Sequence, residues 1–226
     1  MLKDNHKIII SQSEKYRIIK EYRALTEQKD SQFIIKTRRE LTILSKKDDK
    51  NMKESRKEKY LKGEIKRLEA STTNFIGPNP VSMSLNHVNI NNKNSIYEAY
   101  VVTEKADGIR AQLFIGSDNI GYLITQKMEI IGTDISFKDI EGSWLFDGEY
   151  ITKNIDNEDI ELFMVFDVYY SADGRSKYPS HAFTYPWISH KKDDISRYNI
   201  IQEFQKNTEI DTSNSTMRIG FKSYLE

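Results

Sequence analysis

The sequence of 226 residues contains no cysteine. This absence excludes a disulfide framework, a thiolate zinc site and a cysteine nucleophile, and it fits a reducing compartment. The four histidines are scattered, without the HExxH or HxxxH spacing of a metal-binding helix. We therefore expect a cytoplasmic protein, with the nucleus as the open alternative.

Long apolar runs are absent as well. The longest extends from Leu162 to Tyr170 and is interrupted by Asp167, whereas a membrane-spanning helix needs about 20 mostly apolar residues. The N-terminal residues also lack the apolar segment of a secretory signal. No membrane is therefore expected among the partners of this chain.

The net charge is zero, but the charges are unevenly distributed. Residues 1–70 carry 20 Lys and Arg against 12 Asp and Glu, and residues 71–226 carry 14 against 22. This asymmetry indicates two different surfaces, of which the basic one could attract RNA or another polyanion. The simpler alternative is that both charge runs are ordinary solvated faces.

Residues 1–70 are interpreted as a basic upstream segment. Short apolar groups at residues 16–19, 33–35 and 41–44 contain β-branched residues, which favours strands. Residues 45–59 contain almost no apolar residue, so we expect an exposed loop or a solvated helix there. Residues 60–68 have the apolar spacing of a helix, although Gly63 weakens that pattern.

A domain boundary is predicted near residue 70, where charges disappear and two prolines follow. From there to residue 226, apolar groups alternate with turn signals. The expected strands are 99–103, 111–115, 121–125, 143–146, 149–152 and 161–169, with turns at 107–108, 116–117 and 147–148. A helix that starts with two acidic residues is predicted over 193–205. The pattern indicates an antiparallel-rich α+β fold.

The first motif with candidate catalytic residues is KADGIR, residues 105–110, which lies between two predicted strands. A turn there would expose Lys105, and Arg110 beyond it could fork onto phosphate or ribose oxygens. A lysine attacks phosphorus only as the neutral amine, so such a site has to favour that form by burial or by a neighbouring cation. For one short motif alone, a surface hairpin with incidental charges is the simpler interpretation.

Two further motifs follow in order, FDGE at residues 146–149 and FMVFD at residues 163–167. Together with KADGIR, which fits the pattern KxDGxR, they resemble the motifs of the covalent nucleotidyltransferases. That superfamily comprises mRNA capping guanylyltransferases and ATP-dependent DNA and RNA ligases. The resemblance implies an antiparallel-sheet-rich nucleotidyltransferase fold, with residues 71–226 as a partial domain.

The resemblance also implies a role for each motif residue. The catalytic group would be Lys105, which takes GMP from GTP onto Nζ as a phosphoramidate and passes it to the 5′-diphosphate end of RNA. A divalent cation, Mg²⁺ or Mn²⁺, would offset charge on the departing pyrophosphate. The implied nucleotide-binding residues are Asp107 and Gly108 in the loop, Arg110 at the ribose or phosphates, Glu149 at the ribose or metal, Phe166 on the guanine face, and Asp167 at the sugar or metal. For Phe166, plain core packing is the alternative.

Residues 75–83, FIGPNPVSM, favour GTP over ATP as the substrate. They resemble the FxGxxPVSM segment of capping enzymes, which ligases do not normally carry. The simpler alternative is that these residues are an ordinary linker. TEKADGIR with an upstream module is similar to the multifunctional capping enzymes of large cytoplasmic DNA viruses. That likeness would place the protein in a viral factory or a virion. The adenylation domain of an ATP-dependent ligase is the alternative function.

The family's later motifs, with a lysine pair at the α-phosphate, and its OB-fold do not follow in this sequence. Arg218, Lys222 and Tyr224 resemble the strand that precedes them. We therefore expect an incomplete domain that catalyses poorly by itself because phosphate clamping is incomplete. The missing C-terminal part of the same enzyme or a companion subunit would complete it. A noncatalytic nucleotide-binding or RNA-binding remnant is the remaining alternative.

The upstream segment has one further interpretation. In viral capping enzymes of this kind an RNA triphosphatase precedes the guanylyltransferase, and residues 1–70 could be its last strands. Its metal site relies on paired Glu-x-Glu, whereas Glu40, Glu64 and Glu69 are isolated here. No triphosphatase activity is therefore assigned, and either a surface that holds RNA or a degenerate remnant fits the positive charge.

Overall fold

The fold is taken from a computed structural model, which describes residues 8, 10–45, 56–79, 82–92, 95–97, 103–177 and 196–224. The chain divides into two compact units. The helical unit comprises Ile10–Asn74. The sheet unit comprises Met1–Ile9 and Phe75–Glu226, so its two parts lie on either side of the helical unit in the sequence.

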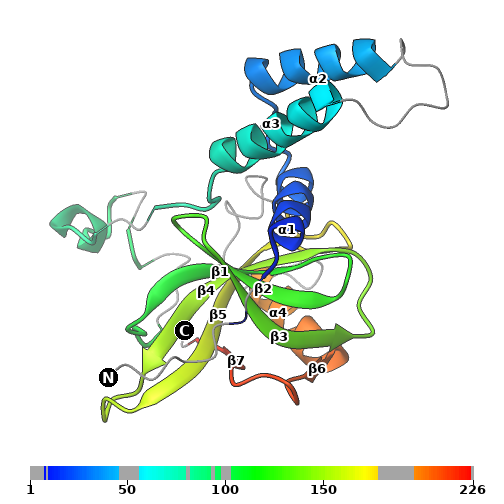
Figure 1. The fold of residues 1–226 in the computed structure, drawn as a ribbon. Helices are drawn as coiled ribbons and strands as arrows, with labels where there is room; N and C mark the ends of the chain where they lie inside the picture. The colour runs from blue at the N-terminus through cyan, green and yellow to red at the C-terminus, as the bar shows by residue number, and fades with distance from the viewer. Residues whose placement is uncertain are drawn as a thin grey trace. The chain divides into compact units, whose positions relative to one another are not determined.

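The helical unit contains α1 (Gln12–Leu25), α2 (Gln32–Ser45) and α3 (Arg56–Thr72), shown in Figure 1. The strands predicted between residues 16 and 44 are therefore wrong. Ser11 begins α1 in a capping box with Glu14. Ile18 and Tyr22 are both fully buried at a spacing of four residues, which is a helical period, so packing overrides the weak strand preference of the isoleucines.

The helix predicted for residues 60–68 is confirmed as part of α3. The predicted loop or solvated helix at residues 45–59 falls largely on residues 46–55, which lie outside the described residues. None of the helices in the described part of the chain is both long enough and apolar enough to cross a membrane.

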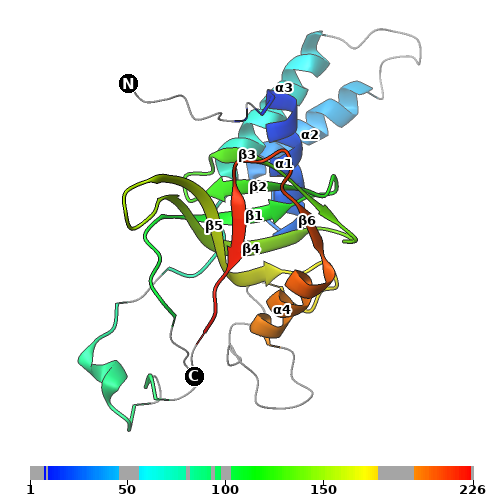
Figure 2. The same cartoon turned by 90° about the horizontal axis from the view of Figure 1, so that it is seen from below.

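The sheet unit is built on one seven-stranded sheet with the order β6-β3-β2-β1-β4-β5-β7. All neighbours are antiparallel except β5 and β7, which run parallel and lie side by side in Figure 2. This mixture of helices with a mostly antiparallel sheet confirms the predicted α+β fold. The elements are η1 (Leu85–Val88), β1 (Ile109–Ile115), β2 (Ile120–Thr125), β3 (Ile130–Lys138), β4 (Trp144–Lys153), β5 (Asp159–Tyr170), α4 (Arg197–Asn207), β6 (Glu209–Asp211) and β7 (Arg218–Phe221).

The turn predicted at residues 147–148 is wrong, because β4 runs through this position without interruption. Asp147 and Gly148 instead pair with Gln112 and Ala111 of β1. A Cβ atom at Gly148 would lie 2.4 Å from Cζ of Phe163. Glycine is therefore used here for a close approach between strands and not for a turn.

The other predicted elements have mixed outcomes. The strands at 111–115, 121–125 and 161–169 are confirmed as β1, β2 and β5, and the turn at 116–117 is confirmed, whereas β3 was not predicted. The predicted helix 193–205 is found as α4, which Ser196 caps and which begins at Arg197. The two acidic residues expected at its start, and residues 99–102 of the first expected strand, lie outside the described residues.

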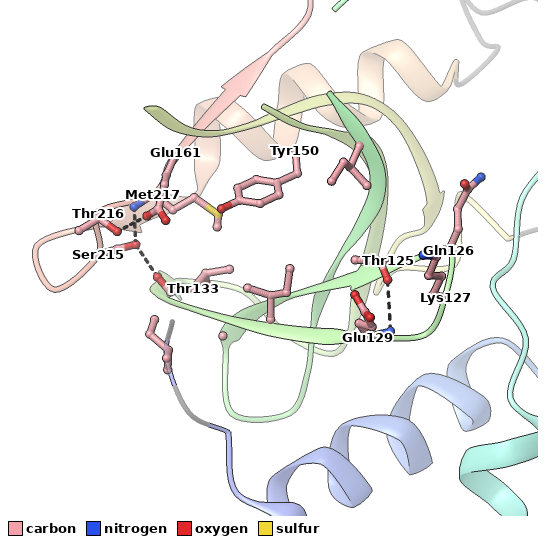
Figure 3. A pocket seen from close by; sticks show the side chains of 14 residues that line it. Thr125, Gln126, Lys127, Glu129, Thr133, Tyr150, Glu161, Ser215, Thr216 and Met217 are labelled. Atoms are coloured by element: carbon pink, nitrogen blue, oxygen red, sulfur yellow. Dashed lines mark hydrogen bonds between the residues drawn. The ribbon is translucent and has the colours of Figure 1, made fainter. Parts of the chain in front are cut away.

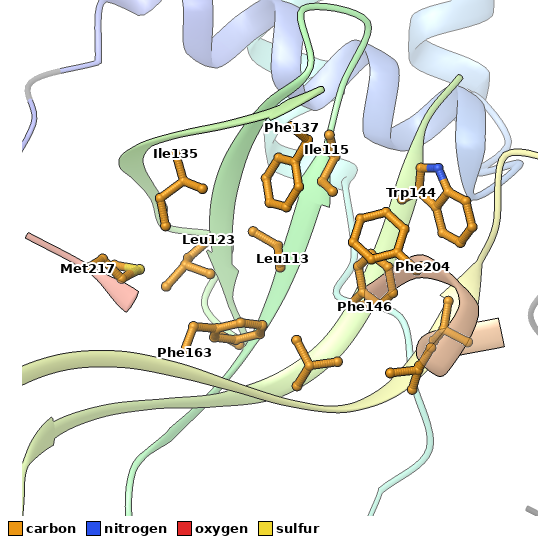
Figure 4. Close-up of a cluster of buried hydrophobic side chains, with 14 of the residues drawn as sticks. Leu113, Ile115, Leu123, Ile135, Phe137, Trp144, Phe146, Phe163, Phe204 and Met217 are labelled. Carbon is orange, nitrogen blue, oxygen red and sulfur yellow. The ribbon is translucent and has the colours of Figure 1, made fainter. Parts of the chain in front are cut away.

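The core lies on the face of the sheet that α4 covers. Ile200, Ile201 and Phe204 of α4 pack against apolar side chains from β1, β3, β4 and β5 (Figure 4). Phe204 lies 4.8 Å from the ring of Trp144 and 4.7 Å from that of Phe146, measured between ring centroids. Because side chains alternate along a strand, Asp147 and Glu149 project from the opposite face of β4.

Candidate active site

Lys105 lies in the wall of a cavity of about 580 Å³ in the sheet unit. Its side chain is 86% exposed, and Nζ lies 3.9 Å from Oδ1 of the exposed Asp107. Nζ also donates a hydrogen bond to the carbonyl oxygen of Ala106, at 3.1 Å. The expected exposure of Lys105 at a loop is thus observed, while the protein itself provides little burial. The cavity is lined by Thr103, Glu104, Lys105, Ala106, Met164, Phe221, Lys222 and Ser223.

Lys222, just beyond the end of β7, forms another part of the cavity wall. Its Nζ donates a hydrogen bond to the carbonyl oxygen of Glu104 at 2.8 Å and lies 5.7 Å from the ring centroid of Phe166. Burial lowers the pKa of Lys222 and the charge of Lys105 lowers it further, while Glu149 raises it. Lys222 therefore lies within electrostatic reach of the lysine, the carboxylate and the aromatic ring that the sequence motifs single out.

The loop after Lys105 is attached to β4 through Gly108. Its backbone N–H donates to Oε1 of Glu149 at 3.1 Å. A Cβ atom at Gly108 would lie 2.5 Å from the carbonyl oxygen of Tyr150, so only glycine allows this approach. Two of the motif residues are thus in direct contact, and the structure joins KADGIR to FDGE.

The guanidinium of Arg110 is fixed by contacts with other groups of the protein. Its guanidinium forms an ion pair with Asp147, with 2.8 Å between Nη2 and Oδ2, and also bonds the hydroxyl of Tyr169 at 2.9 Å and the carbonyl of Pro78 at 2.8 Å. The Tyr169 hydroxyl in turn donates to Oδ2 of Asp147 at 2.6 Å. Burial raises the pKa of Asp147, and the Arg110 guanidinium opposes that shift. These contacts direct the guanidinium toward protein groups, which favours a positioning role for Arg110.

Asp167 faces a different partner from Phe166, its neighbour in β5. Oδ2 of Asp167 lies 3.2 Å from Nη1 of Arg197, and Oδ1 accepts a hydrogen bond from the backbone N–H of Val168 at 2.8 Å. Burial raises the pKa of Asp167 to about 7, and Arg197 opposes that shift. The carboxylate is therefore engaged within the protein.

A divalent cation fits Glu149 better than Asp167. Mg²⁺ is commonly held by one or two carboxylates together with substrate phosphates. Glu149 lies on the side of β4 that faces Gly108 and Lys222, whereas both oxygens of Asp167 already have partners. Among the described residues there is no group of three or more His, Cys, Asp or Glu that could hold a metal ion alone.

A second cavity, of about 400 Å³, opens on the other face of the strands (Figure 3). Ile109 and Tyr150 line it, and they are paired across β1 and β4. Several of its polar groups bond to one another, as when Thr216 donates to Glu161. None of the site residues predicted from the sequence lines this cavity.

Sequence reasoning did not assign three residues of this arrangement. Lys222 was noted only as part of a strand, because a single lysine after an apolar run gives no indication of the site it reaches. Tyr169 lies in an apolar run that gives no sign of a polar role; it is 1% exposed, and its hydroxyl donates a hydrogen bond to Asp147. Asp147 lies inside the FDGE motif, so the motif itself was the available signal.

Comparison with known proteins identifies the family. A search of curated proteins finds no match to this chain. The sequence model of the family described as mRNA capping enzyme, catalytic domain, matches residues 18–225, which include most of the helical unit and the stretch of the sheet unit that follows it. Because the match covers most of the chain, this protein belongs to the family of mRNA capping enzyme catalytic domains.

Proposed function

We propose that this chain is an mRNA guanylyltransferase that works through a covalent GMP adduct on Lys105. Membership in the capping-enzyme family supports nucleotidyl transfer from GTP to RNA at the general level. The observation that carries the finer proposal is the position of Lys105 in a cavity beside a second cation, Lys222. A triphosphate is attracted to two adjacent cations, which places its phosphorus within reach of Nζ.

The reaction is a two-step transfer. Neutral Nζ of Lys105 attacks the α-phosphorus of GTP, the bond to the bridging oxygen breaks, pyrophosphate leaves, and the amine loses its proton. A terminal oxygen of the 5′-diphosphate RNA then attacks the same phosphorus, and the lysine leaves and recovers a proton. Because Lys105 is 86% exposed in the protein alone, we expect the bound nucleotide to exclude water from it.

Glu149 and Arg110 prepare the site in different ways. Glu149 would hold Mg²⁺ or Mn²⁺, which when bound would neutralise charge on the leaving pyrophosphate. Its contact with Gly108 also fixes the loop that carries Lys105. Arg110 secures the start of β1 through Asp147, so we assign it to positioning of this loop.

Phe166 and Lys222 give a physical reason why the site would bind guanine in preference to adenine. Nζ of Lys222 lies over the ring of Phe166, 5.7 Å from its centroid, so a base that stacks on this face of the ring would displace the ammonium toward the edge of the base. Lysine is only a hydrogen-bond donor. Guanine presents the acceptors O6 and N7 on this edge, whereas adenine presents an amino group in place of O6. Lys222 therefore favours GTP.

Labelling with α-labelled GTP and Mg²⁺ tests the proposal. We expect label that survives denaturation, is lost in acid as a phosphoramidate is, and disappears in Lys105→Ala. Lys153→Ala, which changes a lysine of β4 outside the cavity, is the matched control and should keep the label. Saturable GTP binding without an adduct would instead indicate a noncatalytic module, and preferential labelling from ATP would indicate a ligase.

Lys222→Met tests the origin of base preference. We expect the ratio of GTP to ATP labelling to fall by about tenfold, in line with the loss of one charge-assisted hydrogen bond. Lys222→Arg, which keeps the charge and donor character, should retain most of the preference. An unchanged ratio in Lys222→Met would remove Lys222 from base recognition while leaving the role of Lys105 intact.

A further inference from the structure

Phe166 lies at an interruption in the pairing of β4 with β5. Asp147 of β4 pairs with Asp167 of β5. The next residue of β4, Gly148, pairs with Val165, so the pairing skips Phe166. Phe166 is therefore the additional residue of a β-bulge, a feature that departs from the regular ladder and redirects side chains.

The bulge changes which side chains of β5 face the core. Val165 and Val168 are three residues apart, yet both are buried, at 1% and 0% exposure. In a regular strand, residues three apart lie on opposite faces. The bulge between them therefore takes both intervening residues, Phe166 and Asp167, away from the core. The direction of the Phe166 ring depends on this local backbone conformation.

Tyr224 contacts the bulge directly. Its hydroxyl donates a hydrogen bond to the backbone carbonyl oxygen of Phe166, at 2.6 Å. Burial raises the pKa of Tyr224, and Asp167 raises it further, so the hydroxyl keeps its proton and remains a donor. The Tyr224 ring meets the ring of Tyr198 in α4 edge-on, with 5.8 Å between centroids and 86° between planes. Tyr224 therefore connects the bulge with α4.

The residues just before Tyr224 are bonded to both walls of the cavity that holds the proposed nucleophile. The backbone N–H of Lys222 donates to the carbonyl oxygen of Val165 in β5, at 2.8 Å. The hydroxyl of Thr103, in the loop on the other side, donates to the carbonyl oxygen of Ser223 at 3.0 Å. One short segment therefore fixes the bulge relative to that loop.

We propose that Tyr224 is a positioning residue, whose hydroxyl holds the bulge in the conformation that presents the ring of Phe166 to the guanine base. This role rests on the proposed function, in which the base of GTP stacks on Phe166, and it adds the residue that orients this ring. Without the hydroxyl, the carbonyl of the bulge loses a donor, and the backbone that directs the ring is less constrained.

Equilibrium dialysis of labelled GTP against the full chain tests this role. EDTA removes the metal, so that binding is measured without formation of an adduct. Tyr224→Phe removes the hydroxyl and keeps the ring. The matched control is Tyr122→Phe, the same change at a tyrosine of β2 whose hydroxyl donates to Asp118 at 2.8 Å. Tyr122 is not among the residues that line the cavity of Lys105.

We expect the Kd of GTP to rise about fivefold in Tyr224→Phe, in line with the loss of one hydrogen bond. Tyr122→Phe should keep the wild-type Kd. Inorganic triphosphate has no base, so as a competitor of labelled GTP it should bind Tyr224→Phe as tightly as the wild type. Weaker binding of both ligands would indicate a purely structural role of the hydroxyl and overturn the proposal.

A double-mutant cycle with Phe166→Ala shows whether the effect passes through the ring. Phe166→Ala should weaken GTP binding at least about fivefold, because stacking of the base is lost. In this background Tyr224→Phe should have no further effect, since the ring that it orients is absent. The same loss in both backgrounds would overturn the proposal and assign the effect to Lys222. An unchanged Kd in Tyr224→Phe alone would overturn it as well.

This experiment fails separately from the test of the proposed function. Binding is measured without metal, so it does not depend on an adduct at Lys105. A wild-type protein that is labelled by GTP, but whose Kd is unchanged in Tyr224→Phe, refutes only the role of Tyr224. An unlabelled protein in which Tyr224→Phe weakens GTP but not triphosphate refutes only the covalent mechanism. A chain that does not bind GTP refutes both.

Discussion

Arg110 and Asp147 form a buried ion pair across β1 and β4, with the carboxylate 1% exposed and the arginine side chain 18% exposed. Nε of Arg110 bonds both carboxylate oxygens, at 3.3 and 3.2 Å, and Nη2 bonds one of them. Such a pair costs much desolvation, so its removal on one side leaves an uncompensated charge in the interior. The two residues belong to different sequence motifs, and the pair fixes these motifs to each other.

Asp147→Ala is expected to lower the free energy of unfolding by about 3–5 kcal/mol, because Arg110 and Tyr169 lose a shared acceptor. Glu209→Ala is the control, since its partner Lys138 and Glu209 itself are both more than half exposed. We expect the control to cost less than about 1 kcal/mol. Urea unfolding measures both, and equal losses would contradict the assigned burial.

Gly148→Ala is expected to destabilise the sheet unit by about 1–3 kcal/mol or more, because overpacking forces strands apart. The new methyl would meet Cζ of Phe163 at 2.4 Å and the carbonyl oxygen of Met164 at 2.6 Å. Gly63→Ala in α3 has no atom within 4 Å of the new methyl. It should stabilise by about 0.5–1 kcal/mol, since alanine favours helix. Thermal unfolding followed by circular dichroism should therefore show shifts of opposite sign.

Gly77→Ala separates backbone strain from steric contact. Gly77 has φ of 144°, and a Cβ atom there would lie 2.8 Å from Nη2 of Arg110 and 2.9 Å from the Tyr169 ring. Gly174 also has a positive φ, of 76°, but nothing lies within 4 Å of its Cβ position. Gly174→Ala should lower the free energy of unfolding by about 1–2 kcal/mol through backbone strain alone. Gly77→Ala should lower it by clearly more, because steric contact adds to the strain. Similar losses in urea unfolding would argue against the tight packing around Arg110.

The free energy of unfolding should depend on pH through the protonation of Asp167. Its pKa is raised by burial from 3.8 to about 7, so between these values the folded protein keeps a proton that the unfolded chain loses. The free energy of unfolding therefore falls as pH rises from about 4 to 7, by up to about 1.4 kcal/mol per pH unit. Asp167→Asn should flatten this part of the profile, measured by urea unfolding at successive pH values. An identical profile in the variant would show that other groups cause the dependence.

The sequence was informative where a physical signal is local. Alternation of apolar residues predicted β1, β2 and β5, and the apolar spacing at residues 60–68 predicted part of α3. The isoleucines of α1 and α2 led to a wrong prediction of strands. Their intrinsic preference for strands contributes less free energy than the burial of Ile18 and Ile34 on helix faces. β3 was missed because Gly132 and Asp134 interrupt its apolar pattern.

The candidate site was predictable as a set of motifs but not as a set of contacts. KADGIR and FDGE indicated Lys105 and Glu149, and the structure adds their link through Gly108. An Asp-Gly pair is a common turn signal, so nothing in the sequence distinguished it from the strand interior that Gly148 occupies. The approach of Lys222 to Phe166 depends on the parallel pairing of β5 and β7, which joins segments distant in the chain.

The passage that follows the helical unit is secured at the arginine of KADGIR. The carbonyl of Pro78 accepts a hydrogen bond from Arg110, the ring of Phe75 lies 5.6 Å from the guanidinium, and Ile76 accepts from Gln112. A movement of residues 75–78 is therefore transmitted to the first residues of β1, only a few positions from Lys105, the proposed nucleophile. Any rearrangement of residues 75–78 therefore has to break these contacts with Arg110 and Gln112 first.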